Sequence, residues 1–418
     1  MSVVTFLADK PVLQKGFEER TGFVPIKEIT ELLNSENIST YYEALVKSNM
    51  VLNLYSSGFD VLKDYDKIQT MNSEELYDYY DYKLNNVCVG KIQKLQAVDL
   101  KTGYQPYVKK WDSGESVGFK IGYPLLNYTL AGVHRKNLLL HLGHIGKGKT
   151  TTAINMYILP AIEEGENVCI IANEQDENEW RQMVLSTVVF NHTEKNGDKL
   201  NRQRFILGNF TDADKERIKK GEEWLQKQKG KLIFISLNDY AINHVKKIIK
   251  KYSKRGFTEF IFDTMKPEKE NSDKAWAEFD EVAKQLFLLS KKENVAIIAT
   301  AQLSADSMSR RYLDLTCTGK GRGISETAST VIMFRELTTY EKEKLQAFQR
   351  VKDESGKYSH TKKMIPLDVN KNYIVVFIPK NRFGTTDNQI LYERNLSFNT
   401  MKEIGYVDIP YDGFNKRK

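Results

Sequence analysis

The spacing of hydrophobic positions divides this chain into two parts. From about residue 24 to residue 97, apolar side chains recur at the three- and four-residue intervals of amphipathic helices. Thr40 and Glu43 have the spacing of a capping box at the start of one such helix, and Gly58 is its expected end. The other helical stripes consist of Ile26, Ile29, Leu32 and Leu33, and of Leu76, Tyr80, Leu84, Val87, Ile92 and Leu95. The pattern therefore predicts a small helical domain at residues 1–99.

Beyond residue 118 the hydrophobic positions form short continuous runs. They show little alternation, which is typical of strands that are buried on both faces of a parallel sheet between layers of helices. The runs lie at 138–142, 168–172, 232–237, 260–262, 295–299, 331–334 and 373–378. Residues 100–118 are richer in Lys, Gly, Asp and Pro and are expected to form a linker. We therefore predict an α/β domain at residues 119–418, with a mostly parallel sheet flanked by helices.

Composition narrows the class of protein. The chain has 418 residues, of which 41% are hydrophobic and 28% charged, and no apolar run is long enough to cross a membrane. Its beginning lacks the basic and apolar segments of a secretory leader. The three cysteines are far apart, which indicates neither a disulfide framework nor a zinc ribbon. We expect a cytoplasmic protein without a membrane partner, and the net charge of +7 is compatible with a polyanionic one.

The most specific motif is the segment GHIGKGKT at residues 143–150, which fits the phosphate-loop pattern G-x-x-x-x-G-K-[ST]. It follows a predicted strand and precedes a helix-like segment, as the chemistry requires. Its glycines let backbone N–H groups and the helix N-terminus converge on phosphate oxygens, and its hydroxyl is suited to Mg²⁺. The motif predicts binding of ATP and Mg²⁺. The candidate ligands are Gly143, Gly146, Lys147, Gly148, Lys149, Thr150 and Thr151, with Thr150 also on the metal.

Three polar residues follow later strands of the predicted sheet. Because the carboxyl ends of parallel strands share one edge, their side chains are expected near the phosphate loop. Glu174 has the place of a carboxylate that orients the attacking water, although it also belongs to an acidic surface stretch. Asp263 ends an apolar strand, as a Walker B ligand of Mg²⁺ does. Gln302 is placed to sense the γ-phosphate, or alternatively to cap its strand.

Two groups of cations come after these residues. The loop at 304–323 combines glycines with Arg310, Arg311, Lys320 and Arg322, a composition that suits a phosphodiester chain. Lys380 and Arg382 stand at i and i+2 on an extended segment and therefore point to the same side. Together they suit a phosphate bound by a neighbouring subunit, in the manner of an arginine finger.

The order of these features resembles the RecA-type motor of the DnaB family, the hexameric replicative helicases of bacteria and many bacteriophages. Residues 118–126 (GFKIGYPLL) are a looser version of the family's G-F-x-x-L-D segment. Residues 325–334 (SETASTVIMF) are similar to its E-x-x-A-D-x-V-M-F stretch, and residues 380–384 (KNRFG) resemble its K-x-R-N-G. The resemblance covers about residues 118–395.

This resemblance implies an ATP-dependent DNA helicase that forms a homo-hexamer and moves 5′→3′ on single-stranded DNA. Such a protein unwinds forked DNA at a replication fork and has a primase and a helicase loader as partners. By the same resemblance, Lys149 and Thr150 bind phosphates and Mg²⁺, Glu174 activates water, Asp263 serves the metal, Gln302 couples the γ-phosphate to DNA, and Lys380 and Arg382 reach the adjacent subunit's nucleotide.

Departures from the family keep some points open. Asp314 and Leu315 are followed by a longer loop whose cations are displaced, so the identity of the DNA-contacting residues is not fixed. The abundance of Lys, Asn and Tyr suggests a bacteriophage source, and hence the bacterial host cytoplasm. Two alternatives share the same core: a RecA/RadA-type recombinase, and a regulatory RecA-fold ATPase that binds no nucleic acid.

Overall fold

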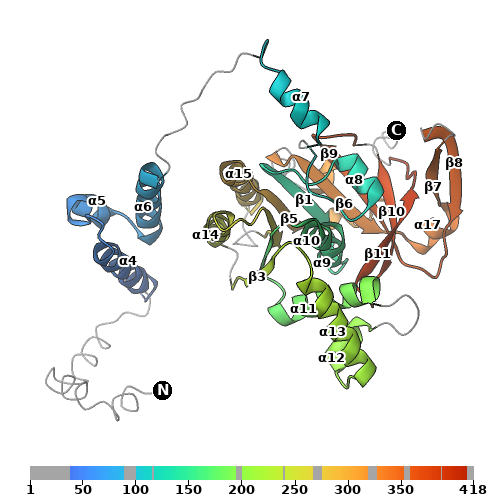
Figure 1. Ribbon diagram of the computed structural model, residues 1–418, viewed down its shortest axis with the longest axis horizontal. Coiled ribbons are helices and arrows are strands. Elements are labelled where there is room, and N and C mark those ends of the chain that lie inside the picture. The colour runs from blue at the N-terminus through green and yellow to red at the C-terminus, as the bar shows by residue number, and fades with distance from the viewer. Residues whose placement is uncertain are drawn as a thin grey trace. The chain divides into compact units, whose positions relative to one another are not determined.

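A computed structural model describes residues 38–88, 100–114, 117–193, 200–238, 241–266, 275–318, 327–352, 358–386 and 388–411. The chain divides into two compact units, Met1–Gly103 and Tyr104–Lys418 (Figure 1). Within the described ranges, no helix combines the length and the hydropathy that crossing a membrane requires.

The first unit is helical where it is described. Its helices are α4 (Ile38–Ser56), a short 3₁₀ turn η2 (Leu62–Asp64), α5 (Tyr65–Thr70) and α6 (Ser73–Cys88). Val61, Ile68, Leu76 and Tyr80 form a small buried core, against which one face of α4 packs. Leu84 of the predicted stripe is exposed, and Ile92 and Leu95 lie outside the described residues.

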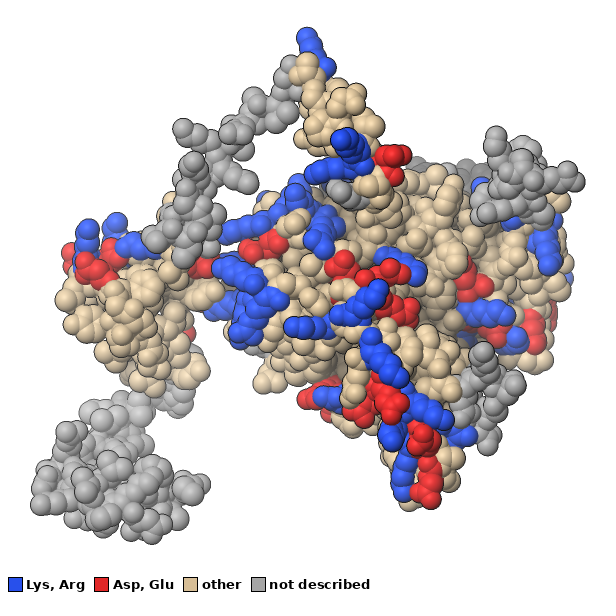
Figure 2. Space-filling view, viewed as in Figure 1, with Lys and Arg blue, Asp and Glu red and all other residues tan. Residues whose placement is uncertain are grey.

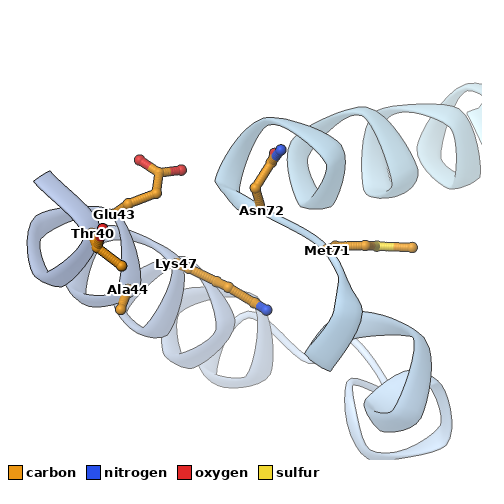
Figure 3. Close-up of a pocket in the computed structure, with 6 residues that line it drawn as sticks. All are labelled: Thr40, Glu43, Ala44, Lys47, Met71 and Asn72. Carbon is orange, nitrogen blue, oxygen red and sulfur yellow. The ribbon is translucent and has the colours of Figure 1, made fainter.

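The capping box predicted at Thr40 and Glu43 is wrong. Helix α4 begins at Ile38, so Thr40 is inside it, and the Glu43 carboxylate instead accepts hydrogen bonds from the backbone N–H (3.2 Å) and hydroxyl of Ser73 at the start of α6. These two residues join neighbouring helices, and Glu43 also lines an open pocket of about 520 Å³ (Figure 3). The error has a physical cause, because the spacing of a cap is identical to that of any two residues on one helical face.

The second unit is built on one sheet of eleven strands in the order β3-β2-β4-β5-β1-β6-β9-β10-β11-β7-β8. From β3 to β6 neighbouring strands are parallel, and from β6 onward they are antiparallel. The strands are β1 (Asn137–Gly143), β2 (Val168–Ala172), β3 (Leu232–Ser236), β4 (Glu259–Asp263), β5 (Ala296–Gln302), β6 (Thr330–Glu336), β7 (Gln346–Lys352), β8 (Tyr358–Pro366), β9 (Tyr373–Asn381), β10 (Gln389–Asn395) and β11 (Thr400–Tyr406).

Helices cover both faces of the parallel part of this sheet, as the continuous apolar runs predict (Figure 1). The core on one face includes α8, η3, α10 and α11, and the core on the other includes α14 and α15. The helices of this unit are α7 (Gln105–Asp112), α8 (Pro124–Leu130), α9 (Lys149–Ala153), a π-helical segment η3 (Ile154–Ile158), α10 (Leu159–Glu164), α11 (Glu177–Val188), a second π-helical segment η4 (Val189–Thr193), α12 (Arg202–Leu207), α13 (Asp212–Gln226), α14 (Ile242–Ser253), α15 (Ala275–Glu293) and α17 (Thr339–Lys344), with short 3₁₀ turns η5 (Ala305–Ser307) and η6 (Leu315–Thr318).

Two local findings go beyond the sequence pattern. Helix α7 lies within the stretch that the composition marks as a linker. Strands β7, β8, β10 and β11 were not predicted, because charged residues interrupt their apolar positions. These four strands continue the antiparallel part of the sheet, and β10 brings a buried arginine, Arg394, to the phosphate loop.

Candidate nucleotide-binding site

The predicted chemistry gathers at the carboxyl edge of the parallel strands. Gly143 at the end of β1 pairs in register with Gln302 at the end of β5, and Ala172 of β2 pairs with Asp263 of β4. Glu174 follows β2 by two residues. The phosphate loop, Glu174, Asp263 and Gln302 therefore meet where an open α/β sheet binds its ligand.

The phosphate loop has the backbone that its sequence requires. Gly146 and Gly148 have φ values of +67° and +79°, a region that other residues rarely adopt. Gly143 leaves room for the ring of Phe334, which would lie only 2.5 Å from an added Cβ. Helix α9 begins at Lys149, so the N–H groups of its first turn face the loop. This arrangement is suited to a polyphosphate.

Thr150 and Asp263 form the oxygen pair expected of a magnesium site. The Thr150 hydroxyl donates to Oδ2 of Asp263 at 2.8 Å, and the Thr300 hydroxyl donates to Oδ1 of the same carboxylate. Burial raises the pKa of Asp263 above its ordinary value, whereas these hydrogen bonds oppose the shift. No cluster of three or more His, Cys, Asp or Glu ligands exists among the described residues. A hydroxyl and a carboxylate fit Mg²⁺, which takes few protein ligands and completes its shell with phosphates and water.

Lys149 is a buried cation beside these groups, with 8% of its surface exposed. Burial lowers the pKa of its ammonium, and the carboxylates of Asp263 and Glu174 oppose that effect. An incoming polyphosphate would add further negative charge next to this ammonium. The side chain is therefore placed as the phosphate cation that the motif predicts.

Glu174 is held at the edge of the sheet by its neighbours. The side-chain amide of Asn173 donates to the Thr264 carbonyl and accepts from the Thr264 N–H, both at 2.9 Å, which ties the end of β2 to the end of β4. One carboxylate oxygen of Glu174 lies 2.5 Å from Nζ of Lys266. Neither Asn173 nor Lys266 belongs to a motif that predicts a role for it.

Arg394 of β10 stabilises the phosphate loop by hydrogen bonding. Its side chain is fully buried, and its guanidinium donates to the Lys147 carbonyl and to Glu336 at the end of β6. The Lys147 ammonium lies 2.5 Å from the other oxygen of Glu336. Loop, strand end and buried arginine thus form one hydrogen-bonded unit, which sequence reasoning missed.

Thr151 and Asn399 connect the helix after the loop to the rest of the domain. The Thr151 hydroxyl donates to Oδ1 of Asn399 at 2.5 Å, and the Asn155 amide donates to the Asn399 carbonyl at 2.8 Å. The Asn399 amide also donates to Thr187 of α11 at 2.8 Å. The hydroxyl of Thr151 therefore has a partner within the protein.

Arg310 and Arg311 lie beside the phosphate loop. They line a pocket of about 550 Å³ together with Ile145 and Lys147 of the loop and Tyr340 of α17. Arg310 donates to Thr316 at 2.6 Å and lies 3.5 Å from Asp314, while Arg311 lies 3.3 Å from Glu341. Lys320 and Arg322 lie outside the described residues.

On the face of this unit that Figure 2 shows, charge alone does not mark a nucleic-acid surface. In Figure 2, cationic and anionic side chains are interspersed over much of the visible face, and cations gather over α14, which carries Lys246, Lys247, Lys250 and Lys251. The nucleic-acid prediction therefore rests on the position of Arg310 and Arg311 beside the phosphate loop.

Lys380 and Arg382 lie away from the phosphate loop of their own chain. Strand β9 is antiparallel to β6, and Lys380 pairs with Val331 near the start of that strand, whereas Phe334 pairs with Gly143. The Arg382 N–H donates to the Ser329 carbonyl at 3.1 Å, five residues or about 16 Å before the level of Phe334. The Arg382 side chain is exposed, with its guanidinium over the ring of Phe287.

The residues that sequence reasoning missed differ in the signal they offered. Glu336 ends an apolar parallel strand, as Asp263 does, so the same rule would have found it. Arg394 offered no signal, because a charged residue in an interrupted apolar run reads as exposed. Lys266 follows Asp263 by three residues, and its contact with Glu174 depends on the pairing of β2 with β4.

Comparisons with known proteins agree with this architecture. A solved structure described as an ATPase domain has a TM-score of 0.56 at 16% identity, covering 73% of this chain and 100% of that one. A structure described as a DnaB-like replicative helicase and its interactions with primase has a TM-score of 0.57 at 14% identity, covering 95% of this chain and 86% of that one. These likenesses confirm the predicted RecA-like α/β fold.

Among curated proteins, the SPbeta prophage-derived uncharacterized protein YorI of Bacillus subtilis (strain 168) is 20% identical over 290 residues. The match covers 62% of this chain, which spans 55% of the length of that relative. The family described as the DnaB-like helicase C terminal domain matches residues 118–399, well over half of the chain. The protein therefore belongs to the DnaB-like helicase family.

Proposed function

We propose that this protein is an ATP-dependent replicative DNA helicase that works as a ring, with homo-hexamer as the expected assembly. The observation that carries the proposal is the separation of Arg382 from the phosphate loop of its own chain. An exposed arginine on the same domain as a complete phosphate loop, yet at the other end of the strands, is suited to the nucleotide of a neighbouring subunit. Hydrolysis would then require assembly.

Within one subunit, each residue at the sheet edge has a separate role in the proposed hydrolysis of ATP. Lys149 and the loop N–H groups bind the triphosphate, and Glu174 orients the attacking water and accepts its proton. Mg²⁺, held by Thr150 and Asp263, would neutralise charge on the phosphates. Gln302 borders Gly143 and would report the γ-phosphate to the loop that follows it.

Single-stranded DNA is the proposed polymer substrate, and forked DNA the proposed substrate for unwinding. Arg310 and Arg311 line a pocket that also includes the phosphate loop, so a bound phosphodiester chain would contact the element that holds the nucleotide. By likeness to the DnaB-like helicase whose structure concerns its interactions with primase, a primase is a proposed partner, as is a loader. Movement 5′→3′, a bacteriophage source and action in the bacterial cytoplasm belong to the same proposal.

Mixing two inactive variants tests the shared site directly. Lys149→Ala removes the phosphate cation and Arg382→Ala removes the proposed neighbour's cation, so each alone should lose DNA-stimulated ATP hydrolysis. Mixed oligomers should regain part of it, because some interfaces join an intact phosphate loop to an intact Arg382. The control mixes each variant with the double variant Lys149→Ala/Arg382→Ala. These mixtures should regain no activity, because none of their interfaces joins an intact phosphate loop to an intact Arg382.

The outcomes separate this proposal from its alternatives. Absence of recovery, or normal hydrolysis by Arg382→Ala alone, would contradict a site shared between subunits. Hydrolysis indifferent to DNA would favour a regulatory ATPase, and strand exchange without unwinding of a forked duplex would favour a recombinase.

A further inference from the structure

Four charged groups meet at the carboxyl ends of β1, β2 and β4, and only three have a role in the proposed reaction. These three are Lys149, Asp263 and Glu174, and the fourth is Lys266. Lys266 follows β4 by three residues, and its ammonium lies 2.5 Å from a carboxylate oxygen of Glu174. Its charge acts on Lys149 across the site and favours the neutral form of that side chain. The phosphate site therefore contains a second lysine.

The ion pair between Lys266 and Glu174 opposes the work proposed for Glu174. The Lys266 ammonium lies 2.5 Å from one carboxylate oxygen of Glu174, so that oxygen is less available to a water molecule. Both side chains are partly accessible, with 21% and 35% of their surfaces exposed, so a ligand can reach the ion pair. Lysine also has a flexible four-carbon stem and three donors, which allows its ammonium to exchange partners.

A γ-phosphate would compete for this ammonium. Glu174 can orient water for attack on the γ-phosphorus only if that phosphate lies close to it, and therefore also within reach of the lysine that now contacts Glu174. The terminal phosphate carries more charge than one carboxylate and offers several acceptor oxygens. A diphosphate lacks this group and would leave the ion pair intact.

We propose that Lys266 is a γ-phosphate ligand within the same subunit, and that its transfer from Glu174 to the triphosphate frees Glu174 to act as the base. This inference rests on the proposed function, because it requires the site to bind ATP. It assigns Lys266 two states: paired with Glu174 in the free and ADP-bound protein, and bound to the γ-phosphate when ATP is present.

The test compares two nucleotides by calorimetry in the presence of Mg²⁺: ADP, and the non-hydrolysable analogue in which an imido group joins the β- and γ-phosphates. Lys266→Met should lower the affinity for the triphosphate analogue about tenfold or more and change ADP affinity by less than about twofold. Lys371→Met is the matched control, because Lys371 is ion-paired to Glu393 at 3.0 Å outside the site. This control should leave both affinities unchanged.

A second variant, Glu174→Gln, should have the opposite effect on the affinity for the triphosphate analogue. Removing the carboxylate charge releases Lys266, so affinity for the triphosphate analogue should rise in the otherwise normal protein. The same change in a Lys266→Met background should produce no such rise. Retained ADP binding shows that each variant is folded.

Equal loss of both nucleotides in Lys266→Met, or no loss of either, would overturn the assignment of Lys266 to the γ-phosphate. An increase on Glu174→Gln that persists without Lys266 would overturn the exchange between the two partners. If the unaltered protein bound neither nucleotide, the proposed function would fail and this inference with it.

Discussion

The hydroxyl of Thr150 donates a hydrogen bond to Oδ2 of Asp263, with 2.8 Å between the two oxygens. The two residues are 113 positions apart in the chain, at the end of the phosphate loop and at the end of β4. Their contact brings together two motifs that the sequence presents separately. It also places a hydroxyl and a carboxylate oxygen where Mg²⁺ would bind beside a polyphosphate.

Asp263→Asn should therefore lower the affinity of the site for Mg²⁺ and have a smaller effect on the stability of the fold. The amide keeps the shape of the buried side chain, but it removes the charge that attracts the cation. In ATP hydrolysis measured over a series of Mg²⁺ concentrations, half-maximal activity should require about tenfold more Mg²⁺ or more, with lower maximal turnover. An unchanged Mg²⁺ dependence would exclude Asp263 as a metal ligand.

Arg394→Met should impair nucleotide binding even though Arg394 would act on the nucleotide only through the phosphate loop. It removes the donors to the Lys147 carbonyl and to Glu336, so the phosphate loop loses its support. We expect affinity for ADP and ATP to fall together by about tenfold, and Arg394→Lys to restore little, because an ammonium cannot reproduce two separately directed guanidinium donors.

Arg335→Met is the control for that experiment. Arg335 is also buried and forms a two-point ion pair with Glu341, and its hydrogen bonds go to Arg311, Glu336 and Glu341 rather than to the phosphate loop. Breaking a buried ion pair costs about 3–5 kcal/mol, so both variants should melt earlier. Only Arg394→Met should weaken nucleotide binding at a temperature where both are folded. Equal effects on binding would reduce Arg394 to a general stabilising role.

The position of DNA is testable through salt dependence. Replacing Arg310 with Ala should weaken binding to single-stranded DNA and flatten the dependence of affinity on salt by about one counterion. The double variant Lys320→Ala/Arg322→Ala applies the same test to the part of the loop outside the described residues. A slope altered only by the second variant would move the DNA contact away from the pocket beside the phosphate loop.

Glu341 should contribute to the loss of folding stability in acid. Burial alone would raise its pKa, but hydrogen bonds from Arg335 and from the Thr338 N–H outweigh burial and lower the pKa to about 2. A carboxyl whose pKa falls on folding stabilises the protein above its unfolded pKa of about 4.5, and this stability is lost as the pH falls toward 2. The contribution is on the order of 2–3 kcal/mol.

Denaturant unfolding between pH 6 and pH 3 measures this contribution. Glu341→Gln should be less stable at pH 6 and should show a shallower loss of stability with acid than the unaltered protein. The exposed Glu343, on the same helix, supplies the control Glu343→Gln. Its curve of stability against pH should coincide with that of the unaltered protein. Parallel curves for Glu341→Gln and the unaltered protein would show that Glu341 does not set this dependence.

Local sequence was sufficient for the parallel half of the sheet. Strands β1 to β6 lie where continuous apolar runs predict them, within a few residues at their ends, and so does β9, the first antiparallel strand. It was insufficient for β7, β8, β10 and β11, which pair in an antiparallel extension and bury only part of their surface. Charged positions such as Arg394 in β10 hide such strands from any rule based on hydrophobic spacing.

The sequence by itself determined the motifs that depend on neighbours along the chain. These are the glycines and lysine of the phosphate loop, and the polar residues that end apolar strands, such as Asp263 and Gln302. Only the tertiary structure decided which distant groups touch them: Arg394 beneath the loop, Lys266 on Glu174, and Arg382 at the far end of the strands. The physical reason is that strand order and register, which arise from long-range pairing, set these distances, while each motif is fixed within one turn of chain.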